Sequence, residues 1–244
     1  MRSISEQTEA ELGGAWSVLV RQKRDHVKLD GLLDEVLATS GSDRDAVLRR
    51  VARLVFPHAF AEESVLWPEL RRCLPEGREL TLRVEREHQE VNDLWLRLET
   101  GECPAPERQQ LVERLVEVLR EDVHDEEDVL LPRLQESVSV KRLRRLGIAW
   151  EAVRRTAPTR PHPVVSRRPP GNALAALPLT VLDRSRDRLD AAANRAPRIA
   201  SALGAASHGV TQMSVRLEHL SPLRRGEHGS TRRTARDVAG DRHG

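Results

Sequence analysis

Histidines followed four residues later by a polar side chain recur along the first half of this 244-residue sequence. The pairs are His26 with Asp30, His58 with Glu62, and His88 with Asn92. A spacing of four places both members of a pair on one face of an α-helix. Imidazole nitrogens and carboxylate oxygens that project from facing helices are the donors that hold pairs of non-haem iron or manganese ions. The pattern predicts a metal site if the helices converge.

A fourth stretch, Asp-Val-His-Asp-Glu-Glu-Asp, offers two pairs with this spacing. On a helical wheel that steps ~100° per residue from Leu111, Asp122 and Glu126 fall inside the apolar stripe, at ~20° and ~60°. On the same wheel His124 and Asp128 fall at ~220° and ~260°, on the solvent side. The wheel therefore favours Asp122 and Glu126 as ligands, whereas generic metal chemistry prefers His124 with Asp128. Both pairs stay as candidates.

Four amphipathic helices are predicted to carry these residues, because apolar side chains recur with a period of ~3.6 residues. They run from about residue 6 to 38, from 44 to 73, from the turn at 74–77 to 99, and from 107 to 135. Such short turns join antiparallel neighbours, so we expect an all-α, up-down-up-down four-helix bundle. Pro57 should kink the second helix, because a proline removes a backbone hydrogen bond. Trp16 should lie on the buried stripe of the first.

The chain divides near residue 156, where its texture and charge change. Residues 1–156 carry a net charge of −6 and form the predicted bundle domain, with a core at about 12–137 and a short fifth helix at about 141–155 packing at one end. Residues 157–171 are rich in proline, which predicts an extended linker. Residues 172–244 are rich in arginine, and the charge from 157 onward is +8. Apart from one helical piece at 172–194, we expect this extension to be disordered.

Several partner and site classes are disfavoured by the composition. The basic extension lacks interleaved aromatic residues and any DNA-binding motif, so we expect no specific nucleic-acid partner. Its histidines and those of the linker are expected to ligate nothing; they are His162, His208, His219, His228 and His243. Tyrosine is absent, which excludes a tyrosinate ligand. The sequence also has no phosphate loop, dinucleotide fingerprint or nucleophile–base pair, so an ordinary hydrolase or transferase is disfavoured.

Cysteine usage and hydropathy bear on the compartment. Cys73 and Cys103 are not arranged in a CxxC pair, so neither a zinc ribbon nor a disulfide framework is indicated. No stretch approaches the ~18 continuous apolar residues that a membrane span requires. From these features we expect a cytoplasmic protein without a membrane partner.

The motifs of residues 12–137 resemble those of the hemerythrin-like HHE cation-binding family. The resemblance rests on His26, on His-Ala-Phe-Ala-Glu-Glu from His58 leading to Leu-Trp-Pro, on Glu-His at His88, and on Glu-Glu-Asp-Val-Leu-Leu-Pro from Glu126. Members of the family are four-helix bundles with a non-haem di-iron centre held by His and Glu/Asp. By this resemblance the ligands are His26, His58, Glu62, His88 and Glu126.

This sequence departs from the family pattern at two positions. Asn92 stands where some members have a second histidine on the third helix, and Asp122 stands where the fourth-helix histidine is expected. The donor set is therefore richer in oxygen than that of an oxygen carrier, and it admits manganese or zinc beside iron.

The resemblance implies a protein that senses or buffers O2, peroxide, nitric oxide or iron, rather than a classical enzyme. Two alternatives remain. One is a peroxide-consuming or ferroxidase-like enzyme that uses the same metals, and the other is a metal-free helical interaction module.

The residues next to the candidate ligands receive weaker predictions. Asp30 either orients a ligating histidine or caps the stripe near solvent. Glu63, Glu127 and Asp128 are expected to form a solvated acidic face. Trp67 and Trp95 are expected to be core residues.

Overall fold

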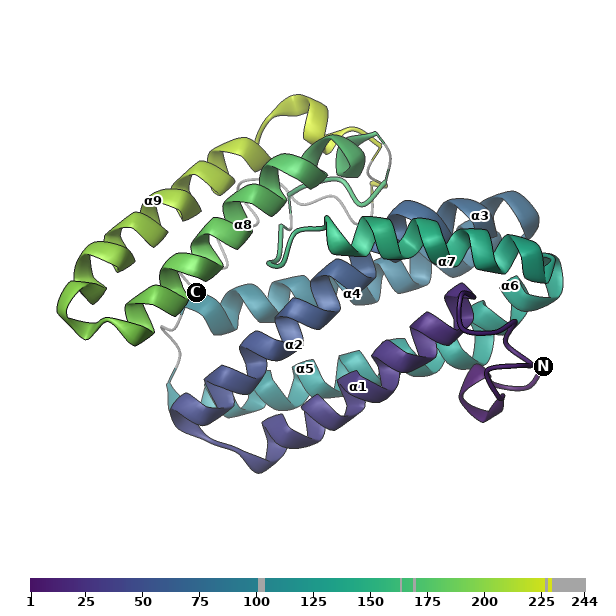
Figure 1. The fold of residues 1–244 in the computed structure, drawn as a ribbon, viewed down its shortest axis with the longest axis horizontal. Helices are drawn as coiled ribbons and strands as arrows, with labels where there is room; N and C mark the ends of the chain where they lie inside the picture. The colour runs from purple at the N-terminus through teal and green to yellow at the C-terminus, as the bar shows by residue number, and fades with distance from the viewer. Residues whose placement is uncertain (101–103, 163, 169, 227, 230–244) are drawn as a thin grey trace.

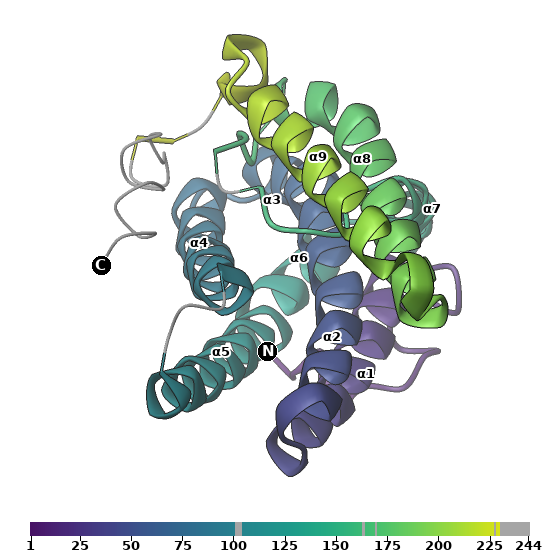
Figure 2. The same cartoon turned by 90° about the vertical axis from the view of Figure 1, so that its left-hand side faces the viewer.

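The fold is built around four long helices. The computed structural model describes residues 1–100, 104–162, 164–168, 170–226 and 228–229, and the regular elements within them are helical. The four are α1 (Val18–Ala38), α2 (Gly41–Ala61), α4 (Gly77–Thr100) and α5 (Ala105–Asp125). Figure 2 shows them around a shared interior, and Figure 1 shows their lengths side by side. The prediction of an all-α four-helix bundle is confirmed.

The apolar core consists of two clusters, with a polar layer between them. Along α1, Leu19 belongs to one cluster and Leu33 to the other, and His26 lies between them. Trp67 and Trp95 are buried in separate clusters, so their prediction as core residues is confirmed. Buried polar side chains therefore occupy the middle of the bundle, where they are costly unless they are paired or bound to a cation.

Two wide helical turns interrupt the bundle at equivalent places. After α2 comes a π-helical turn (Glu62–Leu66) and then α3 (Trp67–Cys73); after α5 comes another (Glu126–Leu130) and then α6 (Leu131–Ser137). Each turn has the sequence Glu-Glu-x-Val-Leu followed by x-Pro. The proline nitrogen cannot donate a hydrogen bond, which favours the change of pattern there. Single π turns inside α-helices are frequent at functional sites.

The structure differs from two expectations about the first helices. Trp16 is 63% exposed, and α1 begins only at Val18, whose preceding Ser17 caps the helix. The reason is a pair of glycines, Gly13 and Gly14, whose positive φ angles of 96° and 87° end any helical path from the N-terminus. Helix α2 continues through Pro57, and a departure from the α-helical hydrogen-bond pattern follows at the π turn.

Helix α7 (Val140–Arg155) is the predicted fifth helix, and it packs along α1 and α2. Gly147 permits this packing, because a Cβ at that position would lie 2.1 Å from the backbone oxygen of Trp16. The close approach brings Trp150, which is 1% exposed, against the bundle. Its ring meets the imidazole of His58 edge-on, with 5.3 Å between centroids. Helix α7 therefore covers one side of the polar layer.

The extension after residue 156 contains more structure than its composition suggested. Helices α8 (Gly171–Arg195) and α9 (Ala200–Glu218) lie side by side as a hairpin, beside the bundle in Figure 1. The predicted piece at 172–194 corresponds to α8, whereas α9 was expected to be disordered. The apolar cluster of the extension is small and includes Leu179 of α8, Leu217 of α9 and Leu223 beyond α9, so a hydrophobic pattern could not reveal the hairpin. Cys103, His243 and the rest of 230–244 lie outside the described residues.

Ion pairs supply much of what holds the extension together. His162 is 9% exposed at its side chain; its Nδ1 lies 2.8 Å from Glu218 and its Nε2 lies 3.1 Å from Asp183. The imidazole thus joins the linker to both helices of the hairpin. Burial opposes a charge on this ring, but the two carboxylates outweigh burial and raise the pKa of His162 to about 10.

No described helix is long and apolar enough to cross a lipid bilayer.

The ion pairs of His162 with Asp183 and Glu218 predict how the stability of the hairpin depends on pH. Because the folded pKa of His162 is raised from 6.5 to about 10, its stabilisation is complete below about pH 6.5 and is lost as the pH rises toward 10. We expect the melting temperature of the wild type to fall more between pH 7 and pH 10 than that of His162→Gln, as measured by circular dichroism. Equal falls in both proteins would contradict this assignment.

Candidate metal centre

The polar layer brings together six of the residues predicted as ligands, from all four long helices and both π turns. They are His26, His58, Glu62, His88, Asp122 and Glu126. All six are at most 9% exposed. Their donor atoms form two adjoining groups, each compact enough to surround one cation.

The first group contains two histidines. His26 Nε2 lies 3.3 Å from His58 Nε2 and 3.2 Å from Glu126 Oε2. His58 Nε2 lies 3.1 Å from Glu62 Oε1. Two nitrogens bound to one ion at about 2.1 Å lie roughly 3 Å apart, so the spacing of the imidazoles suits a shared ion.

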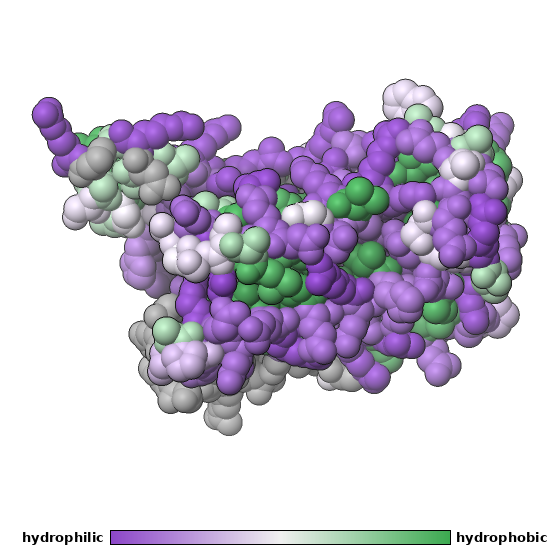
Figure 3. Space-filling model, turned by 90° about the horizontal axis from the view of Figure 1, so that it is seen from below, coloured by the Kyte–Doolittle hydropathy of each residue, from purple (hydrophilic) through white to green (hydrophobic). Residues whose placement is uncertain are grey.

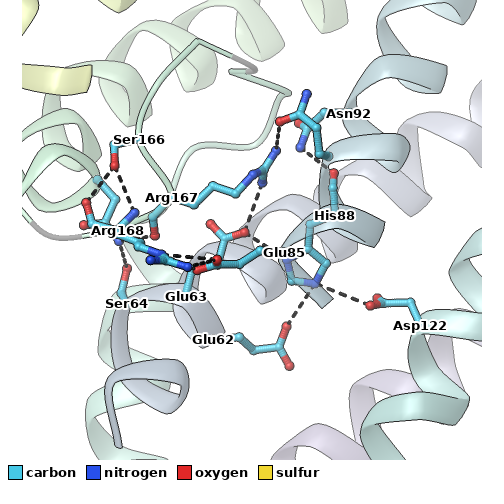
Figure 4. A network of polar contacts seen from close by, with 12 residues as sticks. Glu62, Glu63, Ser64, Glu85, His88, Asn92, Asp122, Ser166, Arg167 and Arg168 are labelled. Atoms are coloured by element: carbon cyan, nitrogen blue, oxygen red, sulfur yellow. Dashed lines mark hydrogen bonds and ion pairs between the residues drawn. The ribbon is translucent and has the colours of Figure 1, made fainter. Parts of the chain in front are cut away.

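The second group is centred on His88 and is richer in oxygen. His88 Nε2 lies 3.6 Å from Asp122 Oδ1 and 3.8 Å from Glu62 Oε2 (Figure 4). It also lies 3.9 Å from Glu126 Oε1. Glu62 and Glu126 therefore each turn one oxygen toward the first group and the other toward the second. Carboxylates placed in this way can bridge two ions.

The outer nitrogen of each histidine faces a carboxylate. The Nδ1 atoms of the three rings lie 2.9 to 3.2 Å from a carboxylate oxygen; the pairs are His26 with Glu127, His58 with Asp25, and His88 with Glu63. A carboxylate that accepts from Nδ1–H leaves the Nε2 lone pair pointing into the cluster. This arrangement is the usual support of metal-binding histidines.

The inner carboxylate oxygens lack hydrogen-bond partners, which makes them available to a cation. Glu62 Oε2, Asp122 Oδ1 and Glu126 Oε1 are buried without a hydrogen-bond donor, and Glu62 Oε1 lies 3.1 Å from His58 Nε2. Burial, together with the charge of Glu126, raises the pKa of Glu62, and burial raises that of Asp122 well above its usual value. Buried acceptors left in this state are costly, and a cation would satisfy them.

Protonation of the histidines reflects the same excess of negative charge. Burial opposes protonation of His26, but its hydrogen bonds to Glu126 and Glu127 raise the pKa to about 9. Burial likewise opposes protonation of His88, and the attraction of Asp122 with the hydrogen bond to Glu63 raises its pKa to about 10. The donor set therefore fits positive charge at its centre, and metal ions would replace these protons.

Comparison with known protein families also indicates a cation-binding domain. The family model described as "Hemerythrin HHE cation binding domain" matches residues 18–134. These residues form a hemerythrin HHE domain. An uncharacterized hemerythrin-like protein of Schizosaccharomyces pombe is 25% identical over 171 residues, which span 68% of this chain and 83% of that protein. No solved structure is significantly similar to the chain.

Three predicted candidates lie outside the cluster of the HHE domain. His124 is 74% exposed at its side chain and contacts Asp128 rather than any member of the cluster. The helical wheel predicted this difference: Asp122 and Glu126 are buried, whereas His124 and Asp128 lie on the outer side of the helix. Asp30 is 66% exposed at its side chain and pairs with Arg120, so it does not orient a histidine. The partners of these two carboxylates are therefore Arg120 for Asp30 and His124 for Asp128, not members of the cluster.

The prediction of a solvated acidic face was wrong for Glu63 and Glu127. Glu63 is 4% exposed, and both carboxylates face histidines of the cluster. The π turns contribute to the error, because a widened turn departs from the regular 100° step on which the expectation rested and brings both successive glutamates toward the polar layer. Asn92 donates to the backbone oxygen of His88 and provides no metal-binding nitrogen.

Sequence reasoning also missed Asp25, the partner of His58. A signal was available. Each carboxylate behind a histidine is adjacent in sequence to a member of the cluster: Asp25 precedes His26, Glu63 follows Glu62, and Glu127 follows Glu126. Acidic doublets at ligand positions therefore mark inner and outer carboxylates of the HHE domain.

A small apolar cavity adjoins the cluster. Its volume is about 20 Å³, against roughly 10–15 Å³ needed for one water molecule. Apolar side chains line it beside the cluster; they are Leu29, Leu54, Val55, Leu119 and Val123. The space is large enough for a molecule of one or two heavy atoms.

Proposed function

We propose that the HHE domain binds a pair of iron ions and uses them to sense or buffer O2, peroxide, nitric oxide or iron itself. The observation that carries this proposal is the bridging placement of Glu62 and Glu126. Each carboxylate directs its two oxygens toward different histidine groups, a placement that a mononuclear site does not require. His26, His58 and His88 would supply nitrogen, and Asp122 would complete the second ion's set.

The donor types favour iron over the other candidates. Three imidazoles with three carboxylates combine nitrogen and oxygen, which suits iron; manganese prefers more oxygen, and zinc usually takes four donors in a single site. When bound, the iron pair would supply reversible redox chemistry and open positions for a small ligand. The protein's contribution is to hold the imidazoles through Asp25, Glu63 and Glu127 and to exclude bulk water.

The cavity and a neighbouring groove support a small ligand as the signal. A groove between α1 and α5 is lined by Val27 and Leu33, and it shares Leu29, Leu119 and Val123 with the cavity beside the cluster. Figure 3 shows apolar patches interrupting the hydrophilic surface on this side of the molecule. A small neutral molecule such as O2 or nitric oxide would need only side-chain motion to pass from the groove to the cluster.

Metal analysis tests this function. Protein produced with added iron should hold about two irons per chain, and azide should change the optical spectrum of the oxidised form. A content below about 0.2 metal per chain would make the metal-free interaction module the better interpretation. A content of two manganese or two zinc ions per chain would support the dinuclear site but contradict the proposal that its metal is iron.

One observation favours the enzymatic alternative. Asp122 gives the second ion an oxygen-rich surrounding, and hard oxygen donors stabilise ferric iron, as a ferroxidase or peroxide-consuming site needs. Iron-loaded protein that consumed many equivalents of H2O2 would support this activity. Consumption of about one H2O2, a two-electron oxidant, per diferrous pair and no further turnover would support sensing or buffering.

A further inference from the structure

A short segment of the extension, residues 164–168, lies against the bundle next to the second group; we call it the strap. Its Arg167 is only 8% exposed and points toward the polar layer (Figure 4). One guanidinium nitrogen donates to Glu63 Oε1 at 3.0 Å, and another donates to Gln89 Oε1 at 2.7 Å. An arginine of the C-terminal extension is thus buried within the HHE domain.

Arg167 and His88 share the same carboxylate oxygen. Glu63 Oε1 accepts from His88 Nδ1 at 2.9 Å and from Arg167 at 3.0 Å. The position of Glu63 therefore depends on the strap, and the orientation of His88 depends on Glu63. Histidine ligands are commonly held in this way, and the holding group affects metal affinity.

Arg167 also contributes positive charge that compensates the carboxylates of the metal centre. Six carboxylates lie in the cluster or directly behind its histidines: Glu62, Asp122, Glu126, Asp25, Glu63 and Glu127. Two divalent ions would offset four of these negative charges. The arginines beside the outer carboxylates offset two more, since Arg154 lies 3.5 Å from Asp25 and Arg167 pairs with Glu63. Buried charges are tolerated when they are compensated in this way.

The next residue of the strap provides a natural comparison. Arg168 pairs with Glu85, a buried carboxylate that also pairs with Arg71. Glu85 has no contact with the cluster among the described interactions. Both strap arginines thus fasten the same segment to the bundle through buried carboxylates, Arg168 through Glu85 of α4 and Arg167 through Glu63 of the first π turn. Of these two carboxylates, Glu63 is the one that holds a histidine.

The strap is joined by hydrogen bonds to α8 and to the short 3-10 turn (Ser221–Arg224) that follows α9. The backbone nitrogen of Ser166 donates to the oxygen of Leu223 at 2.9 Å. Asn172, at the start of α8, donates to the backbone oxygen of Arg167 at 3.0 Å and to Ser64 Oγ at 3.2 Å. Displacement of the hairpin would therefore displace Arg167 as well.

We propose that Arg167 is a positioning residue of the metal centre, through which the C-terminal hairpin and the occupancy of the second metal position are coupled. The inference rests on the proposed dinuclear site. Coupling between two binding events is reciprocal. If docking of the strap strengthens binding at His88, a metal ion at His88 strengthens docking of the strap.

The experiment uses full-length, metal-free protein titrated anaerobically with Co²⁺, whose visible absorption reports on its ligands. Wild type should bind two ions. Arg167→Ala should bind the first ion unchanged and the second about tenfold more weakly, because the holding partner of His88 is lost. Arg167→Lys, which keeps the charge, should recover most of that affinity. Arg168→Ala is the matched control and should bind both ions like wild type.

Hydrogen exchange measured on the same proteins tests the reciprocal effect. Co²⁺ should slow amide exchange in the strap of wild type and of Arg168→Ala, but not in that of Arg167→Ala. Unchanged binding of both ions by Arg167→Ala would overturn the proposal. An equal loss in Arg168→Ala would overturn the positioning role of Arg167, because it would show that the anchoring of the strap alone affects the second ion. Wild type that binds no Co²⁺ would instead overturn the dinuclear site itself.

Discussion

Glu62→Ala is expected to reduce metal binding from about two ions per chain to well below one, with affinity falling by at least about 100-fold. Glu62 is fully buried, and its two oxygens face different groups, at 3.1 Å from His58 and 3.8 Å from His88. A single substitution therefore removes a ligand from both ions. Elemental analysis of protein purified in the presence of iron measures the loss. His58→Ala should also abolish tight binding of the first ion.

The control for this experiment is His124→Ala. His124 has the same spacing to Asp128 that His58 has to Glu62, but its side chain is 74% exposed, so its loss should leave the metal content unchanged. The stability of the metal-free proteins distinguishes misfolding of the variant from loss of a metal ligand. In the metal-free state Glu62→Ala should be at least as stable as wild type, because the substitution removes a buried carboxylate that is repelled by Glu126. Two ions per chain in Glu62→Ala would contradict the bridging role.

Removal of the metal from wild type is expected to lower its melting temperature by about 10 °C. A ligand at 1,000 times its Kd stabilises the folded state by about 4 kcal/mol, and each kcal/mol corresponds to about 2–4 °C for a chain of this size. The physical cause is the repulsion of Glu62, Asp122 and Glu126 when no cation lies among them. Calorimetry before and after chelation, and again after re-addition of metal, measures the change.

Glu62→Ala serves as the control for the chelation experiment. If its metal is lost as expected, chelator should leave its melting temperature unchanged, so any direct effect of chelator on the chain would become visible. A wild-type melting temperature that did not respond to chelation and re-addition would show that the cluster is not stabilised by metal.

Periodicity predicted the inner cluster well because burial and chemistry coincide there. His26, His58 and His88 stand out as polar residues on apolar stripes, and the same reasoning separated Asp122 and Glu126 from their exposed neighbours. The wheel assumes a regular turn of 100° per residue, and over α5 the chain follows it. Residues whose burial follows from a regular helix are therefore accessible to sequence reasoning.

The outer carboxylates could not be found in this way. Glu63 and Glu127 lie in π turns, where the regular wheel places them at the surface. Asp25 pairs with His58 and with Arg154 of α7, a helix distant in the sequence. For the extension, arginine and proline indicated a solvated tail, but Arg167 and His162 are buried with carboxylates from elsewhere in the chain. Ion pairs between distant segments leave no periodic signal.

The two π turns imply that this domain gives up some helical stability for its chemistry. A hydrogen bond from residue i+5 rather than i+4 accommodates one extra residue in each turn, and π geometry is rarely adopted otherwise. A deletion of Val65, or of Val129 in the second turn, would allow a regular helix but would rotate Glu62 or Glu126 relative to the residues that follow. Evolution toward a more stable metal-free bundle would thus be expected to shorten these turns first, and relatives that keep both turns should be those that still select for the centre.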